Sequence, residues 1–111
     1  MARIYSESEV IAAVTDLTET RLVAFCRARL VQPVQSDSGA RMYREADLAR
    51  LQLVSDLAET YDLPEDALDM VMSLIDQLNT MRGDMRALMQ AVAAEPDEVR
   101  TRIHGTLRRL R

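Results

Sequence analysis

The sequence predicts a mostly α-helical protein, as both its composition and its apolar spacing indicate. The chain has 111 residues, 48% of them hydrophobic, and contains only three Gly and three Pro. Ala, Leu, Glu, Asp, Arg and Met dominate, and most of these residue types have high helix propensity. We expect a helix pair and a short β-hairpin in residues 1–61, then a long helix and a short terminal helix in residues 62–111, together forming one compact unit.

Two short helices joined by a tight turn are predicted at the start of the chain. Ser6 precedes Glu9 by three residues, the spacing of a capping box, and an apolar run from Val10 follows. Thr18 is placed to cap the second helix, which Pro33 ends. A lone thiol, Cys26, lies in the apolar stretch of this second helix, and we interpret it as a core residue.

A hairpin and a third helix are expected next. The residues after Pro33 alternate in polarity around Ser38 and Gly39, as two small strands joined by a turn would. A helix is then predicted from Arg44 to near Tyr61, because its apolar residues recur at helical spacing.

The long helix that follows carries an apolar seam. Its apolar residues from Ala67 to Val92 are spaced alternately four and three apart, which is an a/d pattern over about 37 Å. One small domain cannot cover such a stripe, so we expect a homodimer, parallel or antiparallel. The predicted seam residues are Val71, Leu74, Leu78, Met81, Met85 and Leu88.

The first half of this helix is acidic on one face. No basic residue occurs between Arg50 and Arg82. Within that span all five acids are candidate partner-binding residues. For two of them the alternative is a capping box, and for the other three it is a solvated face. The capping pair is Asp62 and Glu65, and the other three acids are Asp66, Asp69 and Asp76.

The end of the chain has the opposite charge. After Pro96, five Arg stand against two acids, and Val99, Ile103, Leu107 and Leu110 form one stripe. A short basic amphipathic helix is predicted, able to dock on the acidic face of its own or a second subunit.

The overall charge and motifs exclude several classes of function. The net charge of -4 disfavours a strongly nucleic-acid-binding surface, although a local basic patch is compatible with it. We find no phosphate loop, catalytic constellation, metal cluster, signal peptide or membrane span, and expect a cytoplasmic protein that is not an enzyme and needs no cofactor. A single Cys fits a reducing compartment.

The segment "SGARMYREADLARLQLVSDLAETYDLPEDAL" resembles the hairpin and following helices of the MerR family of winged helix-turn-helix regulators. In that family the second helix carries a basic residue, an Arg-Tyr-Tyr triplet and a Gly. Here Thr20 replaces the basic residue, Val23 to Phe25 replace the triplet, and Arg29 replaces the Gly. In the hairpin, Ala40 replaces an aromatic residue, while Arg41 and Tyr43 remain. The recognition helix therefore lacks contacts that its architecture would present to DNA.

These departures are closer to the CbpM family of chaperone modulators. That family is marked by "ISEEEL", "VVEP" and "LDWPGI...LTLMDDIAHL". The counterparts here are "LTETRL" (Leu17 to Leu22), "LVQP" (Leu30 to Pro33) and "YDLPEDALDMVMSLIDQL", with Leu63 in place of the aromatic before Pro and Gln77 in place of the second acid. The resemblance extends over roughly residues 4–90.

The resemblance to CbpM implies a specific partner. That partner is the J-domain of a DnaJ- or CbpA-type co-chaperone, whose basic second helix would meet the acidic face, so that the chain inhibits action on DnaK by occlusion. The alternative is a MerR-type transcriptional regulator that binds a pseudo-palindromic operator as a dimer. Its candidate phosphate contacts are Arg27, Arg29 and Arg41.

Overall fold

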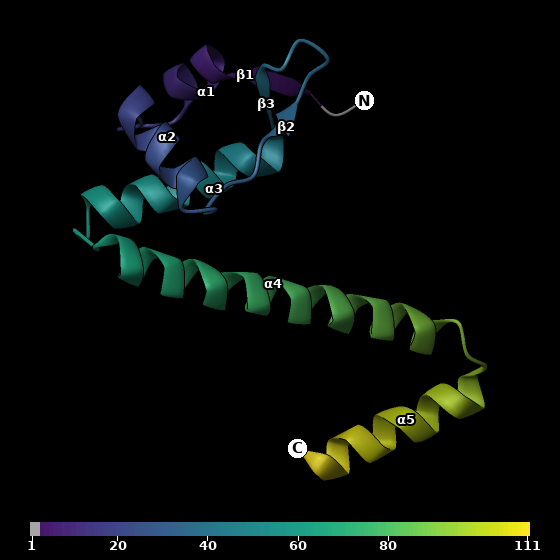
Figure 1. The fold of residues 1–111 in the computed structure, drawn as a ribbon. Coiled ribbons are helices and arrows are strands. Elements are labelled where there is room, and N and C mark those ends of the chain that lie inside the picture. Colours follow the sequence, from purple (N-terminus) through teal and green to yellow (C-terminus); the bar gives the residue numbers. More distant parts are fainter. Residues whose placement is uncertain (1–2) are drawn as a thin grey trace. The chain divides into compact units, whose positions relative to one another are not determined.

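Five helices and one small sheet make up the described part of the computed structural model, residues 3–111 (Figure 1). With 68% helix, this confirms the mostly α class, with a hairpin wing and a long helix after it. The elements are β1 (Ile4–Ser6), α1 (Glu7–Ala13), α2 (Glu19–Arg27), β2 (Val34–Gln35), β3 (Arg41–Arg44), α3 (Glu45–Glu59), α4 (Glu65–Ala93) and α5 (Asp97–Leu110).

The sheet contains the expected hairpin and one strand that the sequence did not predict. Its antiparallel order is β1-β3-β2, with Tyr5 opposite Tyr43 and Val34 opposite Met42. The hairpin turn is closed by Gly39, whose φ of 85° is in the left-handed region that suits Gly. β1 has only three residues and runs directly into the cap of α1, so no alternating pattern marked it.

The caps predicted for the first two helices are confirmed. The Ser6 hydroxyl accepts the Glu9 backbone N–H at 3.3 Å, and the Glu9 carboxylate accepts the Ser6 backbone N–H at 3.0 Å. At the start of α2, the Thr18 hydroxyl accepts the Arg21 backbone N–H at 3.2 Å. Side chains thus satisfy backbone donors that the first turn of each helix leaves without partners.

The end of α2 has a Schellman motif with an arginine at the left-handed position. The Leu30 N–H donates to the Phe25 carbonyl at 2.9 Å, and the Arg29 N–H donates to the Cys26 carbonyl at 3.1 Å. Arg29 has a φ of 60°, where a residue with a side chain costs about 1 kcal/mol more than Gly. This accounts for the Gly that the resemblance places at this position. The Arg50 side chain, from α3, also donates to the Leu30 carbonyl.

The core lies among α1, α2, β3, α3 and the first turns of α4. Val10, Leu22, Tyr43, Leu51 and Val54 are completely buried. The Tyr43 hydroxyl lies 3.6 Å from the sulfur of Cys26, a half-buried thiol in keeping with a core residue. Burial is the main cause that raises the pKa of Tyr43, and the contact with Cys26 raises it further. The Ser55 hydroxyl donates to the Thr15 carbonyl at 3.1 Å, tying α3 to the turn between α1 and α2.

The start of α4 corrects one prediction. Asp62 has a φ of 53° and the helix begins at Glu65, so Asp62 and Glu65 do not form a capping box. Pro64 is the physical reason, because a residue before proline is driven out of the helical region and Leu63 cannot be a first helical residue. Asp62 lies instead in the turn after α3, where the Leu63 N–H donates to the Leu57 carbonyl at 3.2 Å.

The chain forms two compact units that divide inside α4. The N-terminal unit ends at Ser73, and the C-terminal unit is Leu74–Arg111. The sequence-based division into residues 1–61 and 62–111 follows the expected start of the long helix, and it describes two parts of one compact unit. Leu68 and Met72, on α4, are buried and belong to the core of the N-terminal unit. Among the described residues, no helix is long and apolar enough to cross a membrane.

Candidate partner-binding site

A surface hollow brings together the C-terminal end of α2 and the first turns of α4. It has a volume of ≈ 500 Å³ and is lined by Ala28, Glu65, Asp66 and Asp69. We call it the acidic hollow. Two neighbouring turns of α4 supply all three carboxylates, because residues three and four apart share a helix face. The three are exposed, so the hollow offers negative charge to an approaching partner.

Among the described residues, the lining of the acidic hollow contains no basic side chain. The Asp66 carboxylate accepts the backbone N–H of Ala67 at 2.9 Å, a local bond that leaves its charge in place. Arg27 and Arg29 flank Ala28 in sequence and are exposed, so the wall formed by α2 has basic residues at its edges. A basic helix with an acidic residue on one side fits such a surface better than a uniformly basic one.

The predicted acidic set is therefore only partly brought together. Glu65, Asp66 and Asp69 line the acidic hollow, whereas Asp62 is an exposed loop residue outside it. Asp76 is exposed on α4, but it belongs to the C-terminal unit and makes an interaction within the chain.

Two exposed apolar residues near these acids were missed by sequence reasoning. Tyr61 is 67% exposed and Met70 is 66% exposed. Met70 lies one turn after Asp66 on α4 and directly follows Asp69. Its position outside the a/d seam was a signal that could have identified it, since an apolar residue off the seam needs another reason to be apolar. Apolar contact beside charge is the usual composition of a protein interface.

The face that a helix-turn-helix protein presents to DNA carries more acidic than basic side chains in this protein. A hollow of ≈ 470 Å³ lies between the N-terminal ends of α1 and α2 and the hairpin, and its charged members are Glu7, Glu19 and Arg41. A recognition helix contacts base edges with its N-terminal residues, and the first turn of α2 contains Glu19. Two carboxylates beside one guanidinium repel phosphate.

The three predicted phosphate contacts do lie on the surface. Arg27, Arg29 and Arg41 are all exposed. Arg27 is the last residue of α2 and Arg29 comes two residues later, whereas Arg41 is on β3. Arg21, also on α2, is engaged by Glu59 at 2.5 Å.

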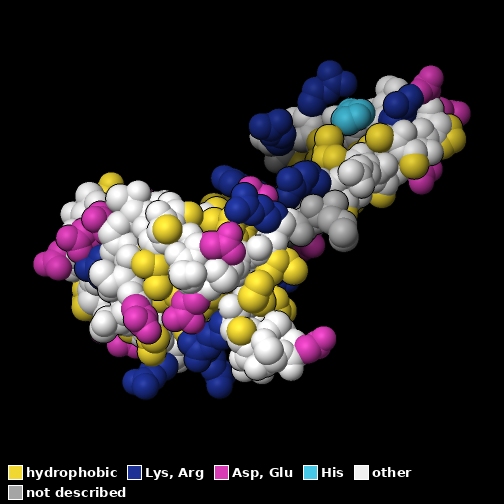
Figure 2. Space-filling view, turned by 90° about the horizontal axis from the view of Figure 1, so that it is seen from above, with side chains coloured by type: hydrophobic (Ala, Val, Ile, Leu, Met, Phe, Trp, Pro, Cys, Tyr) yellow, Lys and Arg dark blue, Asp and Glu magenta, His cyan; other side chains and the backbone are white. Residues whose placement is uncertain are grey.

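The predicted seam residues are largely uncovered in a single chain. Leu74, Leu78, Met81, Met85 and Leu88 are 48–67% exposed, while Val71 is half-buried. Figure 2 shows hydrophobic side chains reaching the surface in the helical C-terminal part of the molecule. Within residues 3–111, no group of His, Cys, Asp and Glu side chains is arranged to hold a metal ion.

A helix pair, a hairpin wing and a following helix define the class of protein as a winged helix-turn-helix. The family model described as "MerR HTH family regulatory protein" matches residues 5–74, which is more than half of the chain. The protein therefore belongs to the MerR helix-turn-helix family. No curated protein matches the sequence significantly. The matched region includes the acidic hollow and ends where the C-terminal unit begins.

Proposed function

We propose that this protein is a chaperone modulator of the CbpM kind. In this proposal it binds the J-domain of a DnaJ- or CbpA-type co-chaperone and inhibits its action on DnaK by occlusion. The chain performs no chemistry, and it acts as a dimer joined through the seam of α4.

The observation that carries the proposal is the acidic hollow with Met70 beside it. A J-domain presents a basic helix, and complementary potentials steer association and suppress wrong partners. Glu65, Asp66 and Asp69 supply the negative potential, and Met70 supplies apolar area that a neighbouring helix can bury. Each pair of carboxylates three or four residues apart costs about 0.2–0.5 kcal/mol of helix stability. A basic partner offsets that cost.

The charge of the wing side supports a protein partner over DNA. Glu7 and Glu19 occupy the hollow beside the hairpin, and the residues that match the Arg-Tyr-Tyr triplet are Val23, Ala24 and Phe25, of which Phe25 is buried. A surface with this charge would lack most of the phosphate contacts that position a helix-turn-helix protein on a duplex.

The proposal is tested by isothermal titration calorimetry against a CbpA-type J-domain. We expect binding by the parent protein and a loss of at least tenfold in affinity for Asp66→Arg and for Asp69→Arg, because each reverses a charge in the acidic hollow. Asp37→Arg is the matched control: it makes the same charge change in the exposed hairpin turn and should bind like the parent.

Two outcomes of this titration would overturn the proposal. One is undetectable binding by the parent protein at hundreds of micromolar J-domain. The other is an equal loss of affinity in Asp37→Arg, which would mean that the change in net charge alone weakens binding. A DnaK ATPase assay stimulated by the same J-domain then measures occlusion, since the parent should suppress the stimulation and Asp69→Arg should not.

A second candidate function is favoured by the family match itself. A MerR-type regulator would bind promoter DNA through Arg27, Arg29 and Arg41, which are exposed. Gel-shift titration against the promoter region of its own gene tests this candidate. A specific shift that weakens steeply with salt, and weakens further in Arg41→Gln, would favour the regulator over the modulator.

A further inference from the structure

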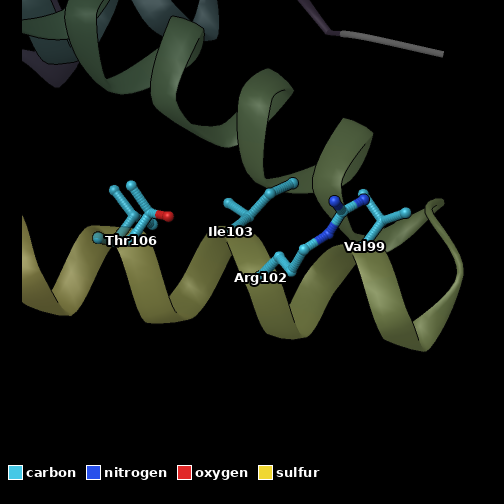
Figure 3. A pocket seen from close by; sticks show the side chains of 5 residues that line it. Val99, Arg102, Ile103 and Thr106 are labelled. Carbon is cyan, nitrogen blue, oxygen red and sulfur yellow. The ribbon is translucent and has the colours of Figure 1, made fainter.

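The apolar stripe of α5 is only partly covered by its own chain. Val99 and Ile103 are half-buried, whereas Leu107 is 47% exposed and Leu110 is 78% exposed. A hollow of ≈ 420 Å³ lies along this stripe, lined by Val99, Arg102, Ile103, Thr106 and Leu107. Figure 3 shows that the labelled side chains lie on the side of α5 that faces α4 of the same chain. The end of the stripe, with Leu107 and Leu110, therefore remains the open part of this apolar face.

The same unit contains a second open apolar face, on α4. Five residues from Leu74 to Leu88 are about half exposed or more, and the C-terminal unit contains no buried apolar residue among those described. Two apolar faces without a core between them are the arrangement expected of half an interface.

The α4 seam by itself is small for a stable dimer. Specific interfaces bury about 800 Å² per partner, from about 20–30 residues a side. The α4 part of the C-terminal unit runs from Leu74 to Ala93, and only the side of it that carries the seam can face a partner. Adding the stripe of α5 brings the contact toward the size that a specific dimer needs.

Charge on the edges of the two faces is also complementary. Helical spacing places Arg102 and Arg109 along one edge of the α5 stripe. On α4, exposed Asp84 is three residues after Met81 and four before Leu88, at the edge of the seam. Charges that flank an apolar seam form ion pairs between helices and select the partner.

We propose that α5 is part of the dimer interface, its apolar stripe covering the α4 seam of a second copy. Arg102 and Arg109 then flank this contact on the side of the second copy's Asp84. The inference rests on the dimer of the proposed function, and it adds a second helix from each chain to that contact. It does not depend on the identity of the partner bound at the acidic hollow.

Sedimentation equilibrium of the full chain tests the contribution of α5. In Leu107→Gln/Leu110→Gln, the dimer dissociation constant should rise roughly 10- to 100-fold, because two apolar contacts per copy are lost. The matched control is His104→Gln/Arg108→Gln, two exposed positions on α5 outside the stripe, which should leave the dissociation constant within about twofold. If Leu107→Gln/Leu110→Gln raises the dimer dissociation constant no more than the control does, the inference is overturned.

Photo-crosslinking identifies what covers the stripe and needs only one substitution. We would place p-benzoylphenylalanine at position 107 and mix copies of natural and ¹⁵N isotopic content. The expected product joins position 107 of one copy to residues 74–93 of the other. Crosslinks confined to a single copy, or formed only with added anionic lipid vesicles, would overturn the inference.

The outcomes separate this inference from the proposed function. A dimeric parent that is insensitive to the α5 variant overturns the role of α5 alone. A monomeric parent at tens of micromolar removes the dimer from both proposals. J-domain affinity, measured by calorimetry in the α5 variant, should stay near the parent value, because the acidic hollow lies in the N-terminal unit.

Discussion

The two units of this protein differ in where their apolar side chains lie. In the described chain every buried apolar residue lies in the N-terminal unit, up to Met72. In the C-terminal unit, Leu and Met residues of similar size stay about half exposed or more. One helix, α4, contributes to both: Leu68 and Met72 enter a core, and Leu78 meets no side chains that would bury it.

This difference teaches that composition alone does not tell a core from an interface. Both parts of α4 show apolar residues at helical spacing, and only the elements packed around them decide whether the residues are buried. The N-terminal unit should therefore have an intrinsic stability, whereas the order of the C-terminal unit should depend on protein concentration.

The largest effect should come from the core of the N-terminal unit. Leu51→Ala removes a completely buried side chain and should lower the free energy of unfolding by about 2–5 kcal/mol. Urea unfolding followed by circular dichroism measures this loss. Leu88→Ala, at an exposed position, is the matched control and at low protein concentration should cost a small fraction of that value. Equal losses would abolish the distinction between the units.

The next largest effect should appear in association. Leu78→Gln places a polar group in the seam and should raise the dimer dissociation constant by roughly tenfold, about 1.4 kcal/mol. Sedimentation equilibrium measures the constant. The unfolding midpoint of the dilute protein should stay unchanged. A lower midpoint at every concentration would instead mean that Leu78 stabilises the single chain.

A smaller effect with the opposite sign is expected at the end of α2. Arg29→Gly should stabilise the protein by about 1 kcal/mol, because Gly adopts the left-handed conformation at φ 60° without steric cost. Arg27→Gly, two residues earlier and still helical, should destabilise it by about 1 kcal/mol. Thermal unfolding of both variants tests the pair, and a loss of stability in Arg29→Gly would contradict the left-handed assignment.

The smallest effect concerns the cap of α1. Hydrogen bonds from the Ser6 backbone and then from its side chain lower the pKa of Glu9 below its ordinary value of 4.5. A lowered pKa means that the capping box contributes above pH 4.5 and loses its contribution as the pH falls through the folded-state pKa. An NMR titration of the Glu9 carboxyl should show a midpoint below 4.5. In Glu9→Gln the amide signals of Ser6 should lose this titration, and a midpoint at or above 4.5 in the parent would contradict the box.

Much of the fold could be predicted because its signals are local. Ser6 with Glu9, Thr18, and the Ser38–Gly39 turn each specify structure within a few residues. The prediction of a capping box at Asp62 also rested on neighbouring residues, but it was wrong. Pro64 acts more strongly on the backbone than a capping pattern does.

The candidate site was harder to predict because it joins distant segments. Ala28 lines the same hollow as Glu65 and Asp69 only after two strands and one helix, β2, β3 and α3, have been placed between them. Spacing along α4 identified the carboxylates but not the wall opposite them, and it gave no reason to single out Met70. Burial of Leu68 and Met72 is what orients α4 so that its acids face that wall.

The continuity of α4 has a consequence for valency. The helix begins at Glu65 in the acidic hollow and runs without a break through the seam to Ala93. A dimer built on that seam therefore carries two identical hollows, one on each copy. Against a surface coated with its target, such a particle would bind by avidity, with slower release than each hollow achieves alone. Diluting the protein until it dissociates would remove this advantage without altering any contact in the hollow.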